Sequence, residues 1–323
     1  MIERHSVPIA SIARVAPSDV GAIGTLYEPE SALELEQLCR RLIGRQLPFD
    51  LVGHTSNILY TSGYKVDRMV STRKVDHYEI RDDAIRCECG ANVRLLSTDA
   101  IQAGCKGFEG LVDLPGTVGS ALYGNAGCYD CSVSDLLTKA TLLMPDGTVQ
   151  TVAPDWFQFT KRSSVLKRHE QQAIILTATL RRDPADAEAL CKMADENHRK
   201  RRFSQPGPKN GLGSVFGNSG EPTPLQDRMD SIYHRFEKLF HWDEADIKTQ
   251  RETKAHLALR LLGDKALLPY VRTWNWYQWN DDNAHKLFWR YVRLHRQMFT
   301  RSDFEIEIKG LSRDAIERLI AAE

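Results

Sequence analysis

Hydrophobic and polar positions alternate at helical spacing near the N-terminus. Within residues 31–44, four leucines recur every two to four positions: Leu33, Leu35, Leu38 and Leu42. Ser31 and Glu34 have the spacing of a capping box, so the pattern predicts an amphipathic helix. Apolar runs at 47–53 and 58–60 flank a short polar loop. They predict a strand, a tight turn and a second strand.

Short strand patterns dominate the next part of the chain. Residues 84–89 alternate in character, and residues 95–104 have helical spacing. The runs 139–144 and 148–152 flank Asp146-Gly147, a dipeptide typical of hairpins, and 173–180 is a further β-rich run. Because strands and helices are mixed, we predict an α+β domain.

A linker separates this part from a C-terminal domain. Residues 184–202 begin with acidic and end with basic residues, as a helix dipole favours, and the Pro- and Gly-rich stretch 203–212 predicts the linker. Helical patterns follow at 224–240, 244–262 and 284–299, with a closing helix at the C-terminus. Between them, Phe304–Ile308 predicts a strand with Glu305 and Glu307 on one face.

Composition narrows the classes of function. The 323 residues carry 43 basic and 43 acidic side chains, which argues against a polybasic nucleic-acid or membrane-surface protein. No apolar run approaches the ~20 residues of a membrane helix, and the N-terminus lacks a signal-peptide core. We therefore expect a cytoplasmic protein, either a monomer or a weak homo-oligomer, with no nucleic-acid or membrane partner.

The seven cysteines show no regular disulfide framework, which favours reduced thiols. Cys128 and Cys131 have the spacing that begins many zinc sites, but tetrahedral zinc needs two more ligands. Cys87 and Cys89 are spaced unsuitably. We therefore expect no metal site.

Seven glycines lie between residues 104 and 127. Glycine is unfavourable inside helices and strands, so we expect these positions to need positive φ or close backbone approach rather than regular structure. Turns of this kind form nests that bind phosphate groups. On the glycines alone, a loop-rich edge without a ligand is the preferred interpretation.

Eight short motifs follow one another in a characteristic order: Gly53-x-x-Ser56-Asn57, Gly107-x-Glu-Gly-Leu111, Leu114-Pro-Gly-Thr-Val-Gly119, Asn125-Ala-Gly127, Lys161-Arg-x-Ser164, Gln205-Pro206, Gly213-Ser-Val-Phe-x-Asn218 and Glu305-Ile-Glu307. Each motif is weak alone, whereas the ordered set is specific. In this set the chain resembles the UDP-N-acetylenolpyruvoylglucosamine reductases over about residues 20–219, with a thinner match at 284–310.

The resemblance implies an α+β fold with a two-lobed FAD-binding domain of the vanillyl-alcohol-oxidase type and a C-terminal α+β substrate domain. It places the lobes at 1–66 and 67–183, a helix and linker at 184–212, and the substrate domain at 213–323. Two loops would cradle the FAD pyrophosphate: Gly53, His54, Thr55, Ser56 and Asn57, and Leu114, Pro115, Gly116, Thr117, Gly119 and Ser120. Three residues would lie beside the isoalloxazine: Asn125, Ala126 and Gly127.

In the family reaction, NADPH or NADH reduces FAD, and hydride then passes to the β-carbon of an enolpyruvyl ether while an acid protonates the α-carbon. By resemblance, Ser214 is the proton donor, Arg162 polarises the substrate carboxylate and Glu307 assists there. Arg201 and Asn218 would bind a nucleotide-sugar-like substrate. Without the motif match, Ser214 would be interpreted as a turn serine, Arg162 as a surface arginine and Glu307 as a solvated edge carboxylate. Such a reductase serves peptidoglycan precursor synthesis.

The chain also departs from the family pattern. Ser120 replaces a glycine, Lys161 a tyrosine and Gly217 a lysine, and no Ser-x-Lys-His-x-x-Phe signature is found. In its place, residues 271–280 carry three tryptophans, which are more often core than a stacking platform for a ligand. Two alternatives therefore stay open, a paralogue with another substrate and a flavin-binding protein without catalysis. His54 and Cys128 also raise covalent flavin attachment, which the family does not use.

Overall fold

The computed structural model describes residues 1–205 and 210–321. Contacts divide the chain into two compact units, each of which is described by itself. Unit 1 comprises Met1–Pro8, Ala22–Ser56 and Lys65–Arg199, and unit 2 comprises Ile9–Gly21, Asn57–Tyr64 and the chain from Lys200 onward. Among the described residues, no helix is long and apolar enough to cross a membrane. The lobe, linker and domain boundaries predicted from the sequence stay a prediction.

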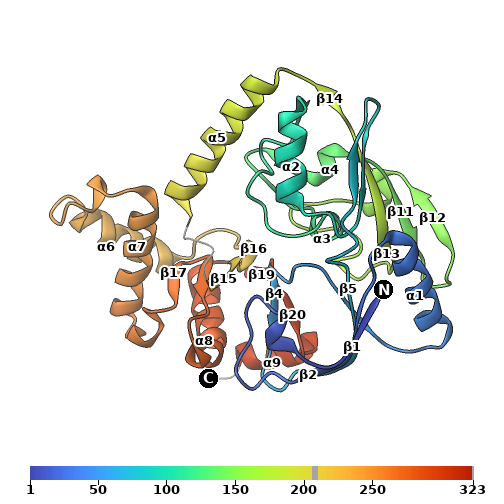
Figure 1. Ribbon diagram of the computed structural model, residues 1–323. Helices are drawn as coiled ribbons and strands as arrows, with labels where there is room; N and C mark the ends of the chain where they lie inside the picture. Colours follow the sequence, from blue (N-terminus) through green and yellow to red (C-terminus); the bar gives the residue numbers. More distant parts are fainter. Residues whose placement is uncertain (206–209, 322–323) are drawn as a thin grey trace. The chain divides into compact units, whose positions relative to one another are not determined.

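The two larger sheets of unit 1 are coloured blue to yellow-green in Figure 1, and two-stranded pairs, β10 (Cys131–Ser132) with β9 (Gly127–Cys128) and β14 (Asp183–Pro184) with β8 (Cys105–Lys106), accompany them. The first has the order β1-β2-β5-β3, formed by Ile2–Pro8, Ala22–Glu28, Val66–Ser71 and Asp50–Val52. The second is antiparallel, with the order β12-β11-β13-β7-β6, formed by Val149–Val152, Leu137–Leu143, Ile174–Leu180, Ile85–Glu88 and Tyr78–Ile80. The β11–β12 hairpin and the strands predicted at 84–89 and 173–180 are confirmed.

Helices pack on the second sheet through their apolar faces. Helix α1 (Ala32–Gly44) begins at Ser31, whose side chain accepts a hydrogen bond from the backbone of Glu34, as the capping-box spacing predicts. Its buried leucines share one hydrophobic core with β13. The remaining short elements of unit 1 are α2 (Val93–Gln102), β8 (Cys105–Lys106), α3 (Val118–Gly124), β9 (Gly127–Cys128), β10 (Cys131–Ser132), α4 (Val133–Leu136), η2 (Pro154–Phe157) and β14 (Asp183–Pro184).

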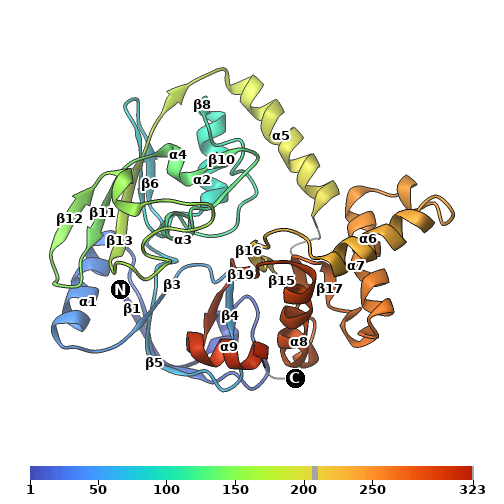
Figure 2. The ribbon, with the colours of Figure 1, turned by 180° about the vertical axis from the view of Figure 1, so that it is seen from behind.

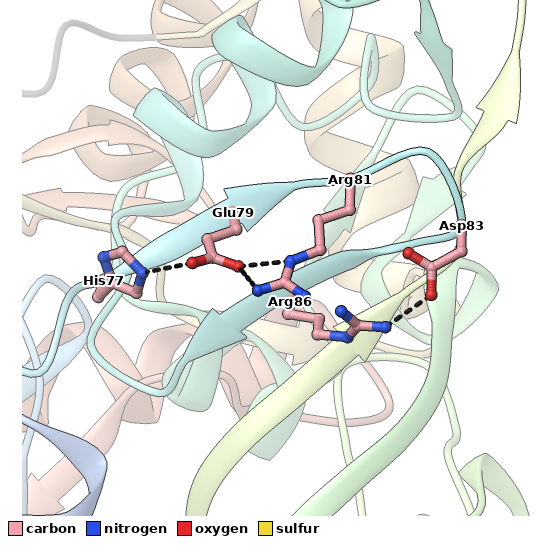
Figure 3. Close-up of polar contacts among 5 residues, drawn as sticks. All are labelled: His77, Glu79, Arg81, Asp83 and Arg86. Atoms are coloured by element: carbon pink, nitrogen blue, oxygen red, sulfur yellow. Dashed lines mark hydrogen bonds and ion pairs between the residues drawn. The ribbon is translucent and has the colours of Figure 1, made fainter.

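Charged residues line the β6–β7 hairpin at the edge of the second sheet. Figure 3 shows the Glu79 carboxylate between two partners: Nε2 of His77 is 3.3 Å away and Nε of Arg81 is 2.6 Å away. Nη2 of Arg86 donates to Asp83 at 2.6 Å. The ion pairs with Arg81, followed by His77, lower the pKa of Glu79. Exposed pairs contribute little to stability, but charges on an edge strand discourage pairing with another chain.

Helix α5 (Ala187–Ser204) begins three residues later than the pattern predicts. Asp183 and Pro184 instead pair with β8, and Asp186 accepts a hydrogen bond from the backbone of Glu188 at 3.1 Å. The helix otherwise confirms the prediction over 184–202. Residues 206–209, the centre of the predicted linker, lie outside the described residues.

Unit 2 mixes small sheets with helices; its C-terminal part is coloured yellow to red in Figures 1 and 2, and its β4 strand (Ile58–Tyr60) is blue. Its helices bear out the three helical patterns and the closing helix: α6 (Pro224–Phe236), α7 (Ile247–Leu261), α8 (Asp282–Met298) and α9 (Arg313–Ala321). Short helical turns are η1 (Ile9–Ser11), η3 (Trp242–Glu244) and η4 (Lys265–Leu267). One sheet has the order β15-β18-β17, formed by Gly211–Ser214, Trp276–Gln278 and Val271–Thr273. The α+β fold class is thus confirmed.

The prediction of one continuous strand over Phe304–Ile308 is wrong. Strand β19 (Asp303–Phe304) pairs with β16 (Phe216–Asn218), whereas β20 (Glu307–Lys309) pairs with β4 (Ile58–Tyr60). Residues 305 and 306 form a bend between the two pairings. The alternating pattern hid this change of partner, so Glu305 and Glu307 do not share one strand face.

Candidate cofactor and substrate site

The two predicted pyrophosphate loops meet in unit 1. A Cβ atom added at Gly53 would lie 2.8 Å from Oγ1 of Thr117, the residue that caps α3. One added at Gly116 would lie 2.9 Å from Oγ of Ser120 and 3.5 Å from Oγ of Ser56, and Gly116 has φ +122°. Backbone and small hydroxyl side chains therefore form this meeting point, which fits the close approach of a phosphate-bearing group.

The backbone of the loop at residues 53–57 is strained at Thr55. Thr55 is only 3% exposed and has φ +53°, an outlier for a β-branched residue. The Arg73 guanidinium supports it, since Nε donates to the carbonyl of Gly53 at 3.1 Å and Nη2 donates to Oγ1 of Thr55 at 3.2 Å. Burial, followed by the charge of Arg73, lowers the pKa of His54. His54 is therefore a neutral imidazole at neutral pH.

We expect Arg73→Ala to weaken FAD binding by roughly tenfold to a hundredfold. Hydrogen bonds from a charged donor are worth ~1.5–3 kcal/mol, and without them the loop loses support for the strained Thr55 conformation. The measurement is a titration of the apoprotein with FAD, followed by flavin fluorescence. Lys74→Ala, which removes an exposed cation from the next residue, is the matched control. An unchanged dissociation constant for Arg73→Ala would show that the loop does not need this arginine.

Arg162 is held against the end of helix α3. Asn125, which ends that helix with φ +43°, donates from Nδ2 to the carbonyl of Thr160 at 3.0 Å. Ser164 is fully buried and donates from Oγ to the carbonyl of Tyr123 at 2.7 Å. Arg162 lies between these two attachments with φ +58°, and its Nη1 is 3.5 Å from the carbonyl of Asn125. The structure thus brings Arg162 to the segment predicted to line the isoalloxazine.

The glycine-rich segment has more regular structure than the glycines predict. Gly119 and Gly124 lie in α3, contrary to the prediction. Close approach explains Gly119, because an added Cβ would be 3.1 Å from the carbonyl oxygen of Cys89, whereas Gly124 meets nothing within 4 Å. At Gly127, an added Cβ would lie 2.2 Å from the carbonyl oxygen of Cys131. Close approach of the backbone thus explains the glycines at 119 and 127. The glycines of this segment do not exclude a helix.

Ser214 and Glu307 belong to neighbouring segments of unit 2. The carbonyl of Val215 accepts from the backbone N–H of Glu305 at 2.8 Å. Asn57 binds this segment through two hydrogen bonds. Its side-chain Nδ2 donates to the carbonyl of Glu305 at 2.8 Å, and its backbone carbonyl accepts from the N–H of Glu307 at 2.8 Å. Asn57, predicted as a cofactor residue, therefore fixes the bend that carries Glu307. The other loop residues, Gly53 to Ser56, belong to unit 1.

A buried histidine supports the same region. His295 on α8 is fully buried, with Nδ1 2.7 Å from Oγ of Ser302 and Nε2 3.2 Å from Oγ of Ser219. Its ring stacks on Phe216, at 3.7 Å between centroids. Ser219 follows β16 and Ser302 precedes β19, so one imidazole ties the two paired strands. Sequence reasoning missed His295, although its spacing from Phe288 and Tyr291 places it on the apolar face of α8.

We expect unit 2 to lose stability in mild acid through His295. Burial lowers the pKa of His295 to about 3, so the unfolded chain binds this proton below pH ~6.5 while the folded chain does not. The stabilisation is complete above that pH and falls as pH decreases, by up to ~1.4 kcal/mol per pH unit. Urea unfolding between about pH 5 and 7, where most carboxylates stay ionised, measures the slope. A His295→Gln variant with the same slope as the parent chain would contradict the assignment.

The remaining predicted residues are more exposed. Arg201 lies on α5 and is partly exposed, and Asn218 at the end of β16 is exposed, with Oδ1 accepting from the N–H of Gly220 at 3.0 Å. Trp276 and Trp279 are 8% and 6% exposed and pack in the core of unit 2, so they offer no open face for a ligand. No cluster of three or more His, Cys, Asp or Glu side chains that could hold a metal is found within 1–205 and 210–321.

Comparisons with known proteins agree with the motif order. Residues 25–153 match the family model described as "FAD binding domain". Over 190 residues the chain is 31% identical to the UDP-N-acetylenolpyruvoylglucosamine reductase of Caldicellulosiruptor saccharolyticus, covering 58% of this chain and 61% of that protein. Over 222 residues it is 29% identical to the protein of the same name from Synechocystis sp., covering 68% of this chain and 69% of that protein.

The match takes in about 60% of the length of the first curated relatives. The fold similarity extends further along the chain. A crystal structure of UDP-N-acetylenolpyruvylglucosamine reductase from Thermus caldophilus superposes with a TM-score of 0.65 at 19% identity, covering 96% of this chain and all of that one. At this identity the structural match supports the fold.

Proposed function

Because this chain belongs to the family of UDP-N-acetylenolpyruvoylglucosamine reductases, as its motif order predicts, we propose that it is an FAD-dependent reductase of an enolpyruvyl ether. NADPH or NADH is the proposed reductant, and a nucleotide-sugar-like small molecule is the proposed substrate. The observation that carries the proposal is the double attachment of the Arg162 turn to the end of α3. It places a permanent cation beside Asn125 in the FAD-binding domain.

The proposed roles of the residues follow from their chemistry. FAD, when bound, supplies hydride exchange between the nicotinamide and the substrate. The Arg162 guanidinium binds and polarises the substrate carboxylate, which stabilises the negative charge that develops there. Ser214 holds the proton for the α-carbon, and Glu307 assists at the same centre. We propose that Arg201 and Asn218 bind the nucleotide-sugar part.

The cofactor site is assigned to the two loops that meet at Gly53 and Thr117, with Arg73 behind them. Their glycines and small side chains leave backbone and hydroxyl groups to face the pyrophosphate. Asn125, Ala126 and Gly127 are proposed to lie beside the isoalloxazine. The residues present therefore fit the cofactor that the domain match implies.

We expect the purified protein to be yellow and to release FAD on acid or heat treatment. Non-covalent binding is expected because the proposed site rests on backbone donors, without a bond to His54 or Cys128. The measurement is an absorbance spectrum, followed by chromatography of the supernatant after precipitation. A colourless protein that cannot be reconstituted with FAD would contradict the cofactor assignment. Flavin that stays with the precipitate would contradict non-covalent binding and point to His54 or Cys128.

A different sugar or natural-product intermediate is the second candidate substrate. Gly217 stands in β16 where the resemblance expects a lysine, so a positive charge is missing at that position. A role in peptidoglycan precursor synthesis and a cytoplasmic location are parts of the first proposal only. A flavin-binding protein without catalysis is less well supported, because Arg162, Ser214 and Glu307 are all present.

A further inference from the structure

Cys128 and Cys131 lie opposite each other across a two-residue hairpin in unit 1. They are direct partners in the antiparallel pairing of β9 with β10. Directly opposed residues place their side chains on the same face of the ribbon, with Cα atoms about 4.5–5.5 Å apart. A disulfide bond spans Cα separations of ~4.4–6.8 Å. The Cα separation of such a pair therefore permits a disulfide bond without a change of strand pairing.

The turn between them is unusual in its residues. Tyr129 and Asp130 both have positive φ, +49° and +57°. Hairpins with two such residues favour Asn-Gly, because a side chain disfavours the left-handed conformation. A covalent link between the residues that flank the turn would restrain exactly this conformation in the oxidised protein.

These two thiols are also reachable, unlike most of the others. All seven cysteines are free. Cys128, Cys131 and Cys191 are partly exposed, whereas Cys39, Cys87, Cys89 and Cys105 are buried. Cys87 lies in β7 (Ile85–Glu88) and Cys89 directly follows that strand, so they lack the cross-strand geometry of the hairpin pair. Accessibility and geometry together therefore single out Cys128 and Cys131.

The two cysteines differ in surroundings. Sγ of Cys131 donates to the carbonyl of Gly107 at 2.6 Å, which links the hairpin to the loop 107–111. Burial, with a smaller contribution from Glu109, raises the pKa of the Cys131 thiol to about 12. Cys131 is thus a poor source of a thiolate for the first attack and suits the second, resolving step.

We propose that Cys128 and Cys131 form a reversible dithiol–disulfide couple that a low-molecular-weight disulfide oxidises. The Cys128 thiolate attacks one sulfur of that oxidant, forms a mixed disulfide and releases the first small thiol. The sulfur of Cys131 then attacks Cys128, its proton leaves with the second small thiol, and the Cys128–Cys131 bond forms. The protein loses two protons and two electrons, and the oxidant takes up both and is reduced to two thiols.

Oxidation also changes how the hairpin holds its neighbour. Once Sγ of Cys131 is bonded to Cys128, it no longer has a proton to donate to Gly107. The loop 107–111 keeps its other attachment, in which Nδ2 of Asn197 donates to the carbonyl of Glu109 at 3.0 Å. We therefore expect faster amide hydrogen exchange in 107–111 in the oxidised protein.

In the test, the isolated protein is treated with oxidised glutathione. Its free thiols are then counted under denaturing conditions, and its peptides are mapped. The expected result is the loss of two thiols per chain, a peptide with Cys128 linked to Cys131, and full recovery on reduction by dithiothreitol. Cys191→Ser should lose two thiols as well. Cys131→Ser should trap glutathione on Cys128. Because the readout is the linkage itself, the result is independent of the proposed flavin chemistry.

An unchanged thiol count in the parent protein would overturn the proposal. So would a map showing glutathione persisting on Cys128, a link through Cys191, or disulfides between chains. Mapping the parent protein needs no substitution, so a variant that fails to fold does not affect this outcome. Equal hydrogen exchange in 107–111 before and after oxidation would overturn the proposed release of the loop.

Discussion

Ser214→Ala is expected to slow substrate-dependent reoxidation of the bound flavin by ~10²–10⁴-fold, while its reduction by NAD(P)H stays near the parent rate. A proton donor to the substrate α-carbon acts only when substrate is reduced, so the first half-reaction does not need it. Ser214 ends the irregular strand β15, next to Gly213, where an added Cβ meets nothing within 4 Å. Stopped-flow absorbance under anaerobic conditions measures the two half-reactions separately.

Two variants make this result interpretable. Ser231→Ala removes an exposed serine from α6 of the same unit and should leave both half-reactions unchanged. Ser214→Cys keeps a transferable proton at this position, on a thiol in place of the hydroxyl, and should recover part of the lost rate. Equal slowing of reduction and reoxidation in Ser214→Ala would contradict the proton-donor role.

Arg162→Met is expected to lower kcat/KM for the enolpyruvyl substrate by ~10²–10³-fold, as removal of one electrostatic stabiliser typically does. The guanidinium is the charge that the turn at Thr160–Ser163 presents beside Asn125. FAD affinity should change little, because the pyrophosphate loops do not include this turn. Steady-state kinetics and an FAD titration of the same preparation measure the two effects.

Arg162→Lys keeps the charge but loses the planar fork, so we expect it to recover only part of the activity. Arg168→Met is the matched control, since the Arg168 guanidinium pairs with Glu170 and the carbonyl of Gln158. A loss in Arg162→Met no larger than in Arg168→Met would show that Arg162 does not contact the reacting centre.

Local patterns predicted the helices and the β11–β12 hairpin because these depend on neighbouring residues. The Asp-Gly turn forms as predicted, and Ser31 caps α1 as its spacing predicts, although the Glu34 carboxylate accepts from the backbone of Glu30 and so does not complete the capping box. The break at residues 305 and 306 could not be predicted, because it results from two distant partners, β16 and β4. An alternating pattern specifies which side chains share a face only while the strand keeps one partner.

The candidate site shows the same division between local and distant information. Motif order predicts the two loops and Arg162 as site residues, but nothing in the local sequence distinguishes Arg73 from the other basic residues. Its role depends on Thr55 adopting positive φ, a backbone property that a threonine does not signal. His295 was detectable from its helical spacing, whereas its two serine partners come from segments far apart in the chain.

In the proposed reaction, the bound flavin passes its electrons to an enolpyruvyl ether. The most direct test of this reaction is to reduce the FAD-loaded protein with one equivalent of NADPH without oxygen, then mix it with a panel of enolpyruvyl nucleotide sugars. We expect one of them to restore the oxidised flavin spectrum stoichiometrically and to be converted to the lactyl ether, and we expect both changes to be far slower in Ser214→Ala. A flavin that is reduced by NADPH but that no enolpyruvyl ether reoxidises faster than buffer would contradict the proposed reaction.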